Sequence, residues 1–120
     1  MRQDLQQKLY AEFPQLLAHL PGIETGDGWY DILYRMSWRI CNYAVLTYGV
    51  AGLERVALGC VKEKFGGLRV YMGVQDPQIE DIVREAVDES WRTCERCGHD
   101  GELRRGAWLV TLCDGCHGAR

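Results

Sequence analysis

The sequence lacks any apolar run long enough to span a bilayer, because charged residues interrupt each hydrophobic stretch. It also lacks the pattern of an export signal at its beginning, where Arg2, Asp4, Lys8 and Glu12 stand among the apolar residues. Both absences favour a cytoplasmic protein that makes no contact with a membrane. Disulfides are rare in a reducing compartment, so the six cysteines are expected to bind metal or to act in catalysis.

Positive charge is also scarce, and the formal net charge is -3. Residues 55–75 are the most basic segment, with four basic residues against one acidic residue, whereas residues 76–91 carry six acidic residues against one basic residue. No segment offers the strongly basic face that phosphate-binding proteins usually need. The charge balance therefore favours a protein partner over nucleic acid.

The N-terminal half has the apolar periodicity of two helices, and no repeat or low-complexity tract interrupts it. The first helix is expected to kink or restart at Pro14 and to end at Pro21-Gly22, with a loop over residues 22–28. The second is expected from Asp27 or Gly28 to about Tyr48. Its first apolar stripe contains Trp29, Ile32, Leu33, Met36, Ile40 and Ala44, and its second contains Tyr30, Tyr34, Trp38, Cys41, Val45 and Tyr48.

A helix with two apolar stripes is either central in the core or partly covered by another molecule, and the core position is the simpler interpretation. After Val56 the period changes to two, which predicts a β-hairpin with its turn at Lys64-Phe65-Gly66-Gly67. Asp76 as N-cap and Pro77 at the first helical position then predict an acidic helix.

The last thirty or so residues contain two C-x-x-C pairs, Cys94/Cys97 and Cys113/Cys116, separated by fifteen residues. This spacing is a strong zinc pattern, because each short turn presents two thiolates and four thiolates complete a closed tetrahedral site. Strand-like pieces around Arg104-Arg105-Gly106 indicate a second hairpin. The sequence predicts one structural zinc ion in a zinc-ribbon-like module.

Other uses of these cysteines stay open. The C-x-x-C-H ending at His117 fits c-type haem attachment, and one C-x-x-C pair alone would fit a thioredoxin-like redox site, but each leaves the second pair without a role. His99 or His117 could also replace one cysteine as a zinc ligand. Cys41 and Cys60 lie in apolar patterns and are expected to be buried thiols.

Two resemblances follow from these motifs. The ending Leu112-Cys113-Asp114-Gly115-Cys116-His117 resembles the last zinc knuckle of HNH-type nucleases, but the interval between the cysteine pairs lacks the catalytic residues of that class. More of the chain, from Gly28-Trp29-Tyr30-Asp31 through Lys62-Glu63-Lys64-Phe65-Gly66 to the cysteine pairs, resembles a group of small phage and prophage proteins with a C-terminal four-cysteine zinc knuckle. That resemblance implies a mobile-element origin and the zinc ligands, and it implies no particular activity.

Together the patterns predict an α+β protein with a core domain over residues 1–91 and a zinc-ribbon-like module over residues 92–120. No enzymatic constellation stands out. The first functional hypothesis is a non-enzymatic interaction protein, plausibly phage-encoded, that modulates or inhibits a host protein complex in the host cytoplasm. A homodimer is also compatible with it. The alternative is a nucleic-acid-binding adaptor that uses basic residues of the two hairpins, namely Lys62, Lys64, Arg69, Arg104 and Arg105.

Overall fold

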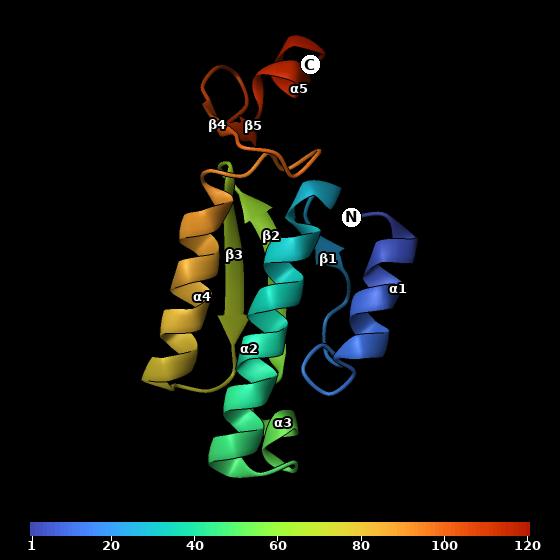
Figure 1. Cartoon of the computed structure of the whole chain (residues 1–120), viewed down its shortest axis with the longest axis vertical. Helices are drawn as coiled ribbons and strands as arrows, with labels where there is room; N and C mark the ends of the chain where they lie inside the picture. The colour runs from blue at the N-terminus through green and yellow to red at the C-terminus, as the bar shows by residue number, and fades with distance from the viewer.

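The computed structural model describes residues 1–120 and has the predicted α+β architecture. Its main sheet contains β1 (Ile23–Glu24), β2 (Leu58–Lys64) and β3 (Gly67–Met72) in that order, with β2 antiparallel to β3 and parallel to β1. The helices α2 (Tyr30–Tyr48) and α4 (Pro77–Ser90) lie side by side across one face of this sheet (Figure 1). A core cluster of 20 buried residues fills the space between the helices and the strands.

A second, smaller layer lies at one end of the molecule (Figure 1). It consists of the antiparallel strands β4 (Glu102–Arg104) and β5 (Val110–Leu112) and the short helix α5 (Asp114–Gly118). The predicted second hairpin is therefore confirmed. No helix in the structure combines the length and the apolar content that crossing a membrane requires.

The N-terminal helix α1 (Gln3–Glu12) ends two residues before Pro14, and residues 14–19 continue as turns. Proline in a helix interior removes a hydrogen bond and clashes with the preceding turn, so the predicted interruption at Pro14 is confirmed. The predicted continuation of the helix to Pro21-Gly22 is wrong, because residues 14–19 form turns. The prediction of a plain loop over residues 22–28 is wrong in part, because Ile23 and Glu24 form β1. Two residues are too few for the alternation that identifies a strand in sequence.

The second helix has the predicted bounds. A 3-10 turn, η1 (Asp27–Trp29), leads into α2, which ends at Gly49 with a φ of 79°. The first apolar stripe is fully buried, whereas the second lies at the edge of the core, with Trp38 53% exposed. The core therefore accounts for one stripe of the helix and only part of the other.

The main hairpin turns at Phe65 and Gly66, whose φ angles of 57° and 91° match a type I′ turn. A short helix, α3 (Gly52–Arg55), and an irregularity between Leu58 and Cys60 precede the regular pairing. This bulge reverses the alternation, so Leu58 and Val61 point to the core and Cys60 points away. The expectation of two buried thiols is wrong in degree, because Cys41 and Cys60 are both half-buried.

The acidic helix α4 begins as predicted. The buried Asp76 carboxylate accepts the backbone N–H groups of Gln78 and Ile79 at 2.9 and 3.3 Å. It also accepts the hydroxyl groups of Tyr43 and Tyr48, which fix the end of α2 against the start of α4. These hydrogen bonds lower the pKa of Asp76, with the bond from Tyr48 as the largest cause.

Candidate metal centre

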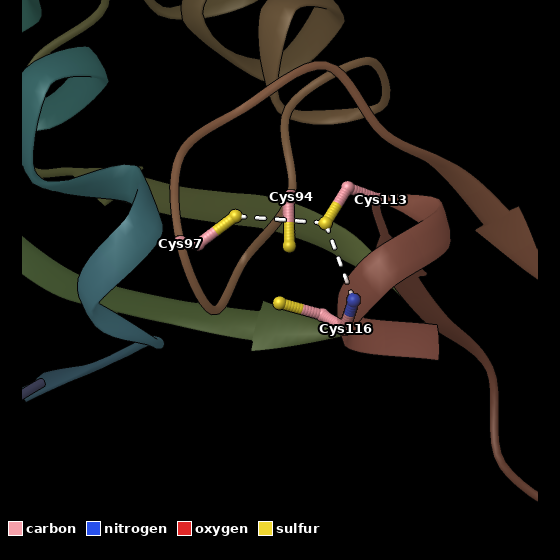
Figure 2. A group of neighbouring side chains, drawn as sticks. All are labelled: Cys94, Cys97, Cys113 and Cys116. Carbon is pink, nitrogen blue, oxygen red and sulfur yellow. Dashed lines mark hydrogen bonds between the residues drawn. The ribbon is translucent and has the colours of Figure 1, made fainter. Parts of the chain in front are cut away.

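The structure brings all four predicted zinc ligands together. The sulfur atoms of Cys94, Cys97, Cys113 and Cys116 lie within 4.8 Å of one another and point to a common centre (Figure 2). The first pair comes from the turn after α4 and the second pair from the beginning of α5. Residues more than fifteen positions apart in the chain therefore build one cluster that could hold a metal ion.

The spacing of the sulfurs fits a tetrahedral ion. A zinc–sulfur bond of about 2.3 Å places the corners of a tetrahedron about 3.8 Å apart. The sulfurs of Cys97 and Cys113 are 3.6 Å apart, and all six distances between the four sulfurs are within 4.8 Å. The donor set itself, four soft thiolates with no carboxylate, is typical of zinc or iron sites and unlike sites for magnesium or calcium.

The first cysteine turn is held by its own backbone. The N–H of Cys94 donates to the carbonyl of His99 at 2.7 Å, and the N–H of Gly98 donates to the carbonyl of Cys94 at 2.9 Å. Gly98 has a φ of 85°, a conformation that glycine adopts without the steric cost a side chain would bring. The tight turn thus points Cys94 and Cys97 at the same centre.

The second turn is a helix start. Cys113 is the N-cap of α5, and its sulfur accepts the backbone N–H of Cys116 at 3.3 Å. This hydrogen bond fixes the Cys113 side chain within the turn that also carries Cys116. Cys113 is therefore both the N-cap of α5 and a predicted zinc ligand.

The charges of the cluster favour a bound cation. Burial raises the pKa of the Cys94 thiol, but hydrogen bonds from the backbone of Cys113, Cys97 and Arg96 outweigh it and bring the pKa to about 6. The pKa of Cys116 is raised to about 12, because its thiol shares a hydrogen bond with Cys113 and is partly desolvated. One thiolate is thus favoured at neutral pH while further negative charge is opposed, and a divalent ion would offset that repulsion.

The two histidines lie outside the sulfur cluster. The Nδ1 of His99 lies 3.2 Å from the Cys97 sulfur, which is a hydrogen-bonding distance. His117 lies within α5, where its backbone N–H donates to the carbonyl of Cys113 at 2.9 Å. Both C-x-x-C pairs contribute to one cluster. This arrangement favours a single four-sulfur site over haem attachment or a redox pair, each of which would use only one pair.

The residues that sequence reasoning missed lie beneath the first turn. The backbone N–H groups of Gly26 and Gly28 donate to the side chain and the carbonyl of Glu95, at 2.9 and 2.7 Å. A Cβ at Gly28 would overlap the carbonyl oxygen of Cys94. The nearby indole of Trp29 is fully buried and donates to the carbonyl of Thr93 at 2.9 Å. The glycines permit this backbone contact, and their G-x-G pattern is the one signal that could have indicated it.

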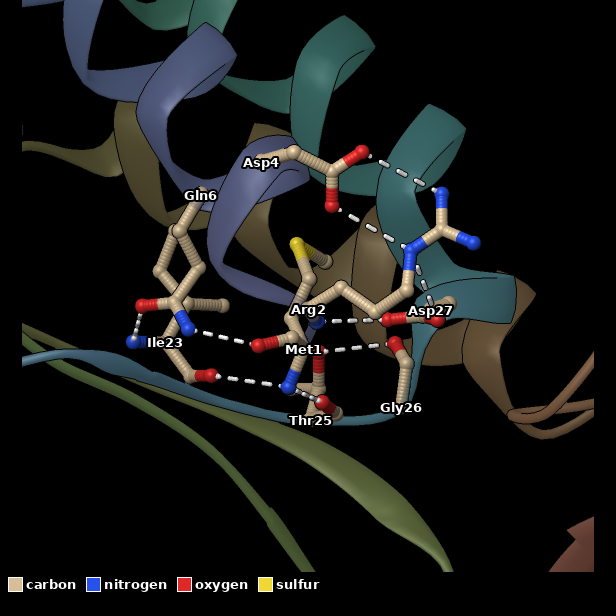
Figure 3. Close-up of polar contacts among 8 residues, drawn as sticks. All are labelled: Met1, Arg2, Asp4, Gln6, Ile23, Thr25, Gly26 and Asp27. Carbon is tan, nitrogen blue, oxygen red and sulfur yellow. Dashed lines mark hydrogen bonds and ion pairs between the residues drawn. The ribbon is translucent and has the colours of Figure 1, made fainter.

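A network at the N-terminus holds this glycine loop (Figure 3). Gln6 links α1 to β1, donating to the carbonyl of Met1 and accepting from the N–H of Ile23 at 2.6 and 3.0 Å. The N–H of Arg2 donates to the Asp27 carboxylate at 2.7 Å. These hydrogen bonds connect the loop around Gly26 and Gly28, which contacts the first cysteine turn, to the first helix.

The two hairpins lie in contact. The hydroxyl of Thr111 donates to the carbonyl of Gly66 at 2.7 Å, which joins β5 to the turn of the main hairpin. Arg104 does not face outward, however. Its side chain is 13% exposed and contacts the Leu112 carbonyl, Asp114 and Glu102 at 3.1, 2.7 and 3.0 Å. The prediction that Arg104 contributes to a basic binding face therefore disagrees with its position, because its guanidinium contacts groups within residues 102–114 instead of solvent.

The fold and the cluster define an α+β protein with a four-cysteine site near its C-terminus that could hold a metal ion. Comparison with known proteins adds no relative, since no family model, no curated protein and no solved structure matches the chain.

Proposed function

We propose that the protein is a non-enzymatic interaction protein whose C-terminal module is held by one structural zinc ion. Cys94, Cys97, Cys113 and Cys116 would be the four ligands. Zinc suits this site because it accepts four thiolates in a closed tetrahedron and undergoes no redox change in the cytoplasm. Four protein ligands leave no coordination position for a substrate or a water molecule, which supports a structural role over a catalytic one.

The observation that carries the interaction role is the position of Trp38 on the outer side of α2. Trp38 is half exposed and lines a groove of about 510 Å³ between α2 and α4. Val45 and Leu46 follow it by two helical turns, so they project from the same side, and Leu46 is 87% exposed. Exposed apolar side chains gathered in this way are typical of binding surfaces, and tryptophan is enriched among the residues that dominate binding energy.

The charges around the groove favour a protein over a polyanion. Arg35 pairs with Glu89 at 2.5 Å, and Arg39 pairs with Glu85, so the positive and negative groups of the rim compensate one another. A partner would therefore present apolar side chains flanked by charged groups of both signs. The apolar face of an amphipathic helix with charged residues along its edges has this arrangement. The resemblance to phage proteins implies that this partner is a host protein, which the present protein would modulate by occupying one of its surfaces.

The metal part of the proposal is tested by native mass spectrometry before and after treatment with a chelator. We expect one zinc ion per chain, and its loss with the chelator. The same spectra give the oligomeric state. A chain that carries no zinc, or that carries haem or disulfides, would refute the structural zinc site.

The interaction part is tested by placing a photo-crosslinking amino acid at Leu46, with Gln7 on α1 as an exposed control position. A protein crosslinked from position 46 alone is purified and titrated by calorimetry against the wild type and the Trp38→Ser/Leu46→Ser variant. We expect a binding loss of tenfold or more, on the scale of an interface hot spot of about 2 kcal/mol. Equal crosslinking from both positions would contradict the surface. A self-crosslink would instead make a second copy of the chain the partner.

A further inference from the structure

The face of the main sheet that points away from the helices carries cations and aromatic rings. Residues directly opposite each other in an antiparallel pair share a face, and the register pairs Lys62 with Arg69 and Cys60 with Tyr71. These four residues point away from the core, whereas Val61 and Val70 point into it. Lys64 continues the outward row of β2. We call Lys62, Lys64, Phe65, Arg69 and Tyr71 the sheet platform.

The three cations of the sheet platform have no acidic partner within ion-pair distance, in contrast to Arg35 and Arg39 on α2. Lys62 and Arg69 stand directly opposite each other across two strands, an arrangement of like charges that destabilises a sheet. The one carboxylate on the same face is Glu24, which is next to Lys62 on the edge strand. The fold thus maintains a local excess of positive charge that a bound anion would relieve.

The two aromatic residues of the sheet platform are not used by the core. Tyr71 is 51% exposed and Phe65 is 61% exposed. The ammonium groups of Lys62 and Lys64 lie 6.0 and 5.5 Å from the centres of the Tyr71 and Phe65 rings, respectively. A cation therefore lies over an exposed ring twice, once on the strand and once at the turn.

We propose that the sheet platform binds a single-stranded polynucleotide. Its cations complement phosphate groups, and its exposed rings provide surfaces on which unpaired bases stack. A duplex hides its base faces, so it would use the cations alone. The inference is independent of the proposed protein partner, since it concerns the opposite face of the molecule. It differs from a surface spread over both hairpins, because Arg104 takes no part in it.

The test measures fluorescence anisotropy of labelled oligonucleotides of about 12 nucleotides, as DNA, as RNA of the same sequence and as a DNA duplex, between about 50 and 200 mM salt. We expect the wild type to bind the single strands more tightly than the duplex. Lys62→Ala/Arg69→Ala should weaken single-strand binding by tenfold or more and reduce the salt slope by about 1.4, at about 0.7 per phosphate contact. Comparison of the DNA and RNA strands shows whether the 2′-hydroxyl contributes.

Two further variants separate stacking from charge. Phe65→Asn removes a ring at a left-handed position that asparagine tolerates, and Tyr71→Val keeps a residue that favours strands. Each should weaken single-strand binding about fivefold or more while leaving the salt slope unchanged. Lys8→Ala/Arg92→Ala is the matched control, because it removes the same charge from exposed positions outside the platform.

Folding is checked by thermal unfolding of each variant. Lys62→Ala/Arg69→Ala should be as stable as the wild type or more stable, because it removes a like-charge pair. The Trp38→Ser/Leu46→Ser variant of the helix face should bind the oligonucleotides normally, which separates this inference from the protein interaction. The proposal is overturned if the wild type binds none of the oligonucleotides, if the control variant loses as much affinity as the platform variant, or if the ring variants bind single strands unchanged.

Discussion

The two hairpins of the protein are held in opposite ways. Strands β2 and β3 belong to a core cluster of 20 buried residues that also draws on β1, α1, α2, α4 and the turns between them. In residues 92–120, by contrast, the buried side chains are Cys94, Thr111 and Leu112. Three such residues bury too little apolar surface to order a segment of this length. Burial therefore stabilises the first region, whereas the second has four clustered sulfurs that could hold a metal ion and contacts with the first region.

The largest expected effect is a loss of structure in the cysteine-containing region that leaves the core folded. Cys113→Ser removes one of the four proposed ligands, and structural zinc sites contribute on the order of 10 kcal/mol to the folding of small zinc modules. We expect loss of zinc and loss of amide protection over residues 94–117, with protection retained in α2 and β2, measured by native mass spectrometry and hydrogen exchange. Cys60→Ser, outside the cluster, should keep the metal. Uniform loss of protection along the whole chain would show that the two regions fold as one unit.

The next largest effect is expected from a substitution at Gly28, where the core contacts the first cysteine turn. Gly28→Ala places a methyl group against the Cys94 carbonyl, where backbone must move to make room. Overpacking of this kind costs about 1–3 kcal/mol, and we expect both the stability of the core and the zinc affinity to fall. Gly73→Ala is the matched control, because its added methyl group meets no atom within 4 Å. Denaturant unfolding measures the stability of the core, and chelator competition measures the zinc affinity. An unchanged zinc affinity would contradict a role of Gly28 in positioning the first cysteine turn.

A smaller effect is expected to stay within the metal module. Arg104→Ala removes the contacts to Leu112 and Asp114 that orient the second cysteine turn. Loss of such supporting contacts typically lowers metal affinity about 10- to 100-fold. We expect this loss in chelator competition, with the unfolding of the core unchanged, whereas Arg105→Ala at an exposed position should have no effect. Equal effects of both variants would point to charge alone.

The smallest effect is expected to stay within the core. Asp76→Ala removes both the cap of α4 and the acceptor of the Tyr43 and Tyr48 hydroxyl groups. The lost cap alone should cost about 0.5–2 kcal/mol in denaturant unfolding, and zinc affinity should not change. Because the folded state lowers the pKa of Asp76, its contribution is present above the ordinary carboxyl pKa of about 4 and is lost as the pH falls through the lower folded value. The difference in stability between wild type and variant should therefore shrink below about pH 4. A constant difference would assign the effect to the removed contacts rather than to the charge.

Much of the fold could be predicted because its signals are local. The helix α4 is specified by Asp76 and Pro77, and the main hairpin by its Phe65-Gly66 turn. Each cysteine pair is recognised by its two-residue spacing, which lets one short turn present two sulfurs to the same point. The helix start, the turn and each C-x-x-C pair are all decided by residues within a few positions of one another.

The features that could not be predicted depend on distant parts of the chain. Strand β1 exists because Ile23 pairs with Val61, and the outward turn of Cys60 depends on a bulge that changes the alternation. The role of Gly28 is visible only when Cys94 lies against it. Arg104 looked like a free cation in sequence, because its partner Asp114 lies ten residues away. Tertiary contacts, rather than local preference, decide all four.

The tip of the β4–β5 hairpin is a position at which the chain could accept inserted residues. Residues 105–108 are exposed, and nothing lies within 4 Å of a side chain added at Gly106. Each cysteine pair is anchored separately, the first near Gly28 and the second through Thr111 and Gly66. Inserted residues at the tip would extend into solvent without moving either anchor. The fifteen-residue interval between the pairs is therefore a feature of this chain rather than a requirement of the metal, and the tip is the natural position for a label or a grafted peptide.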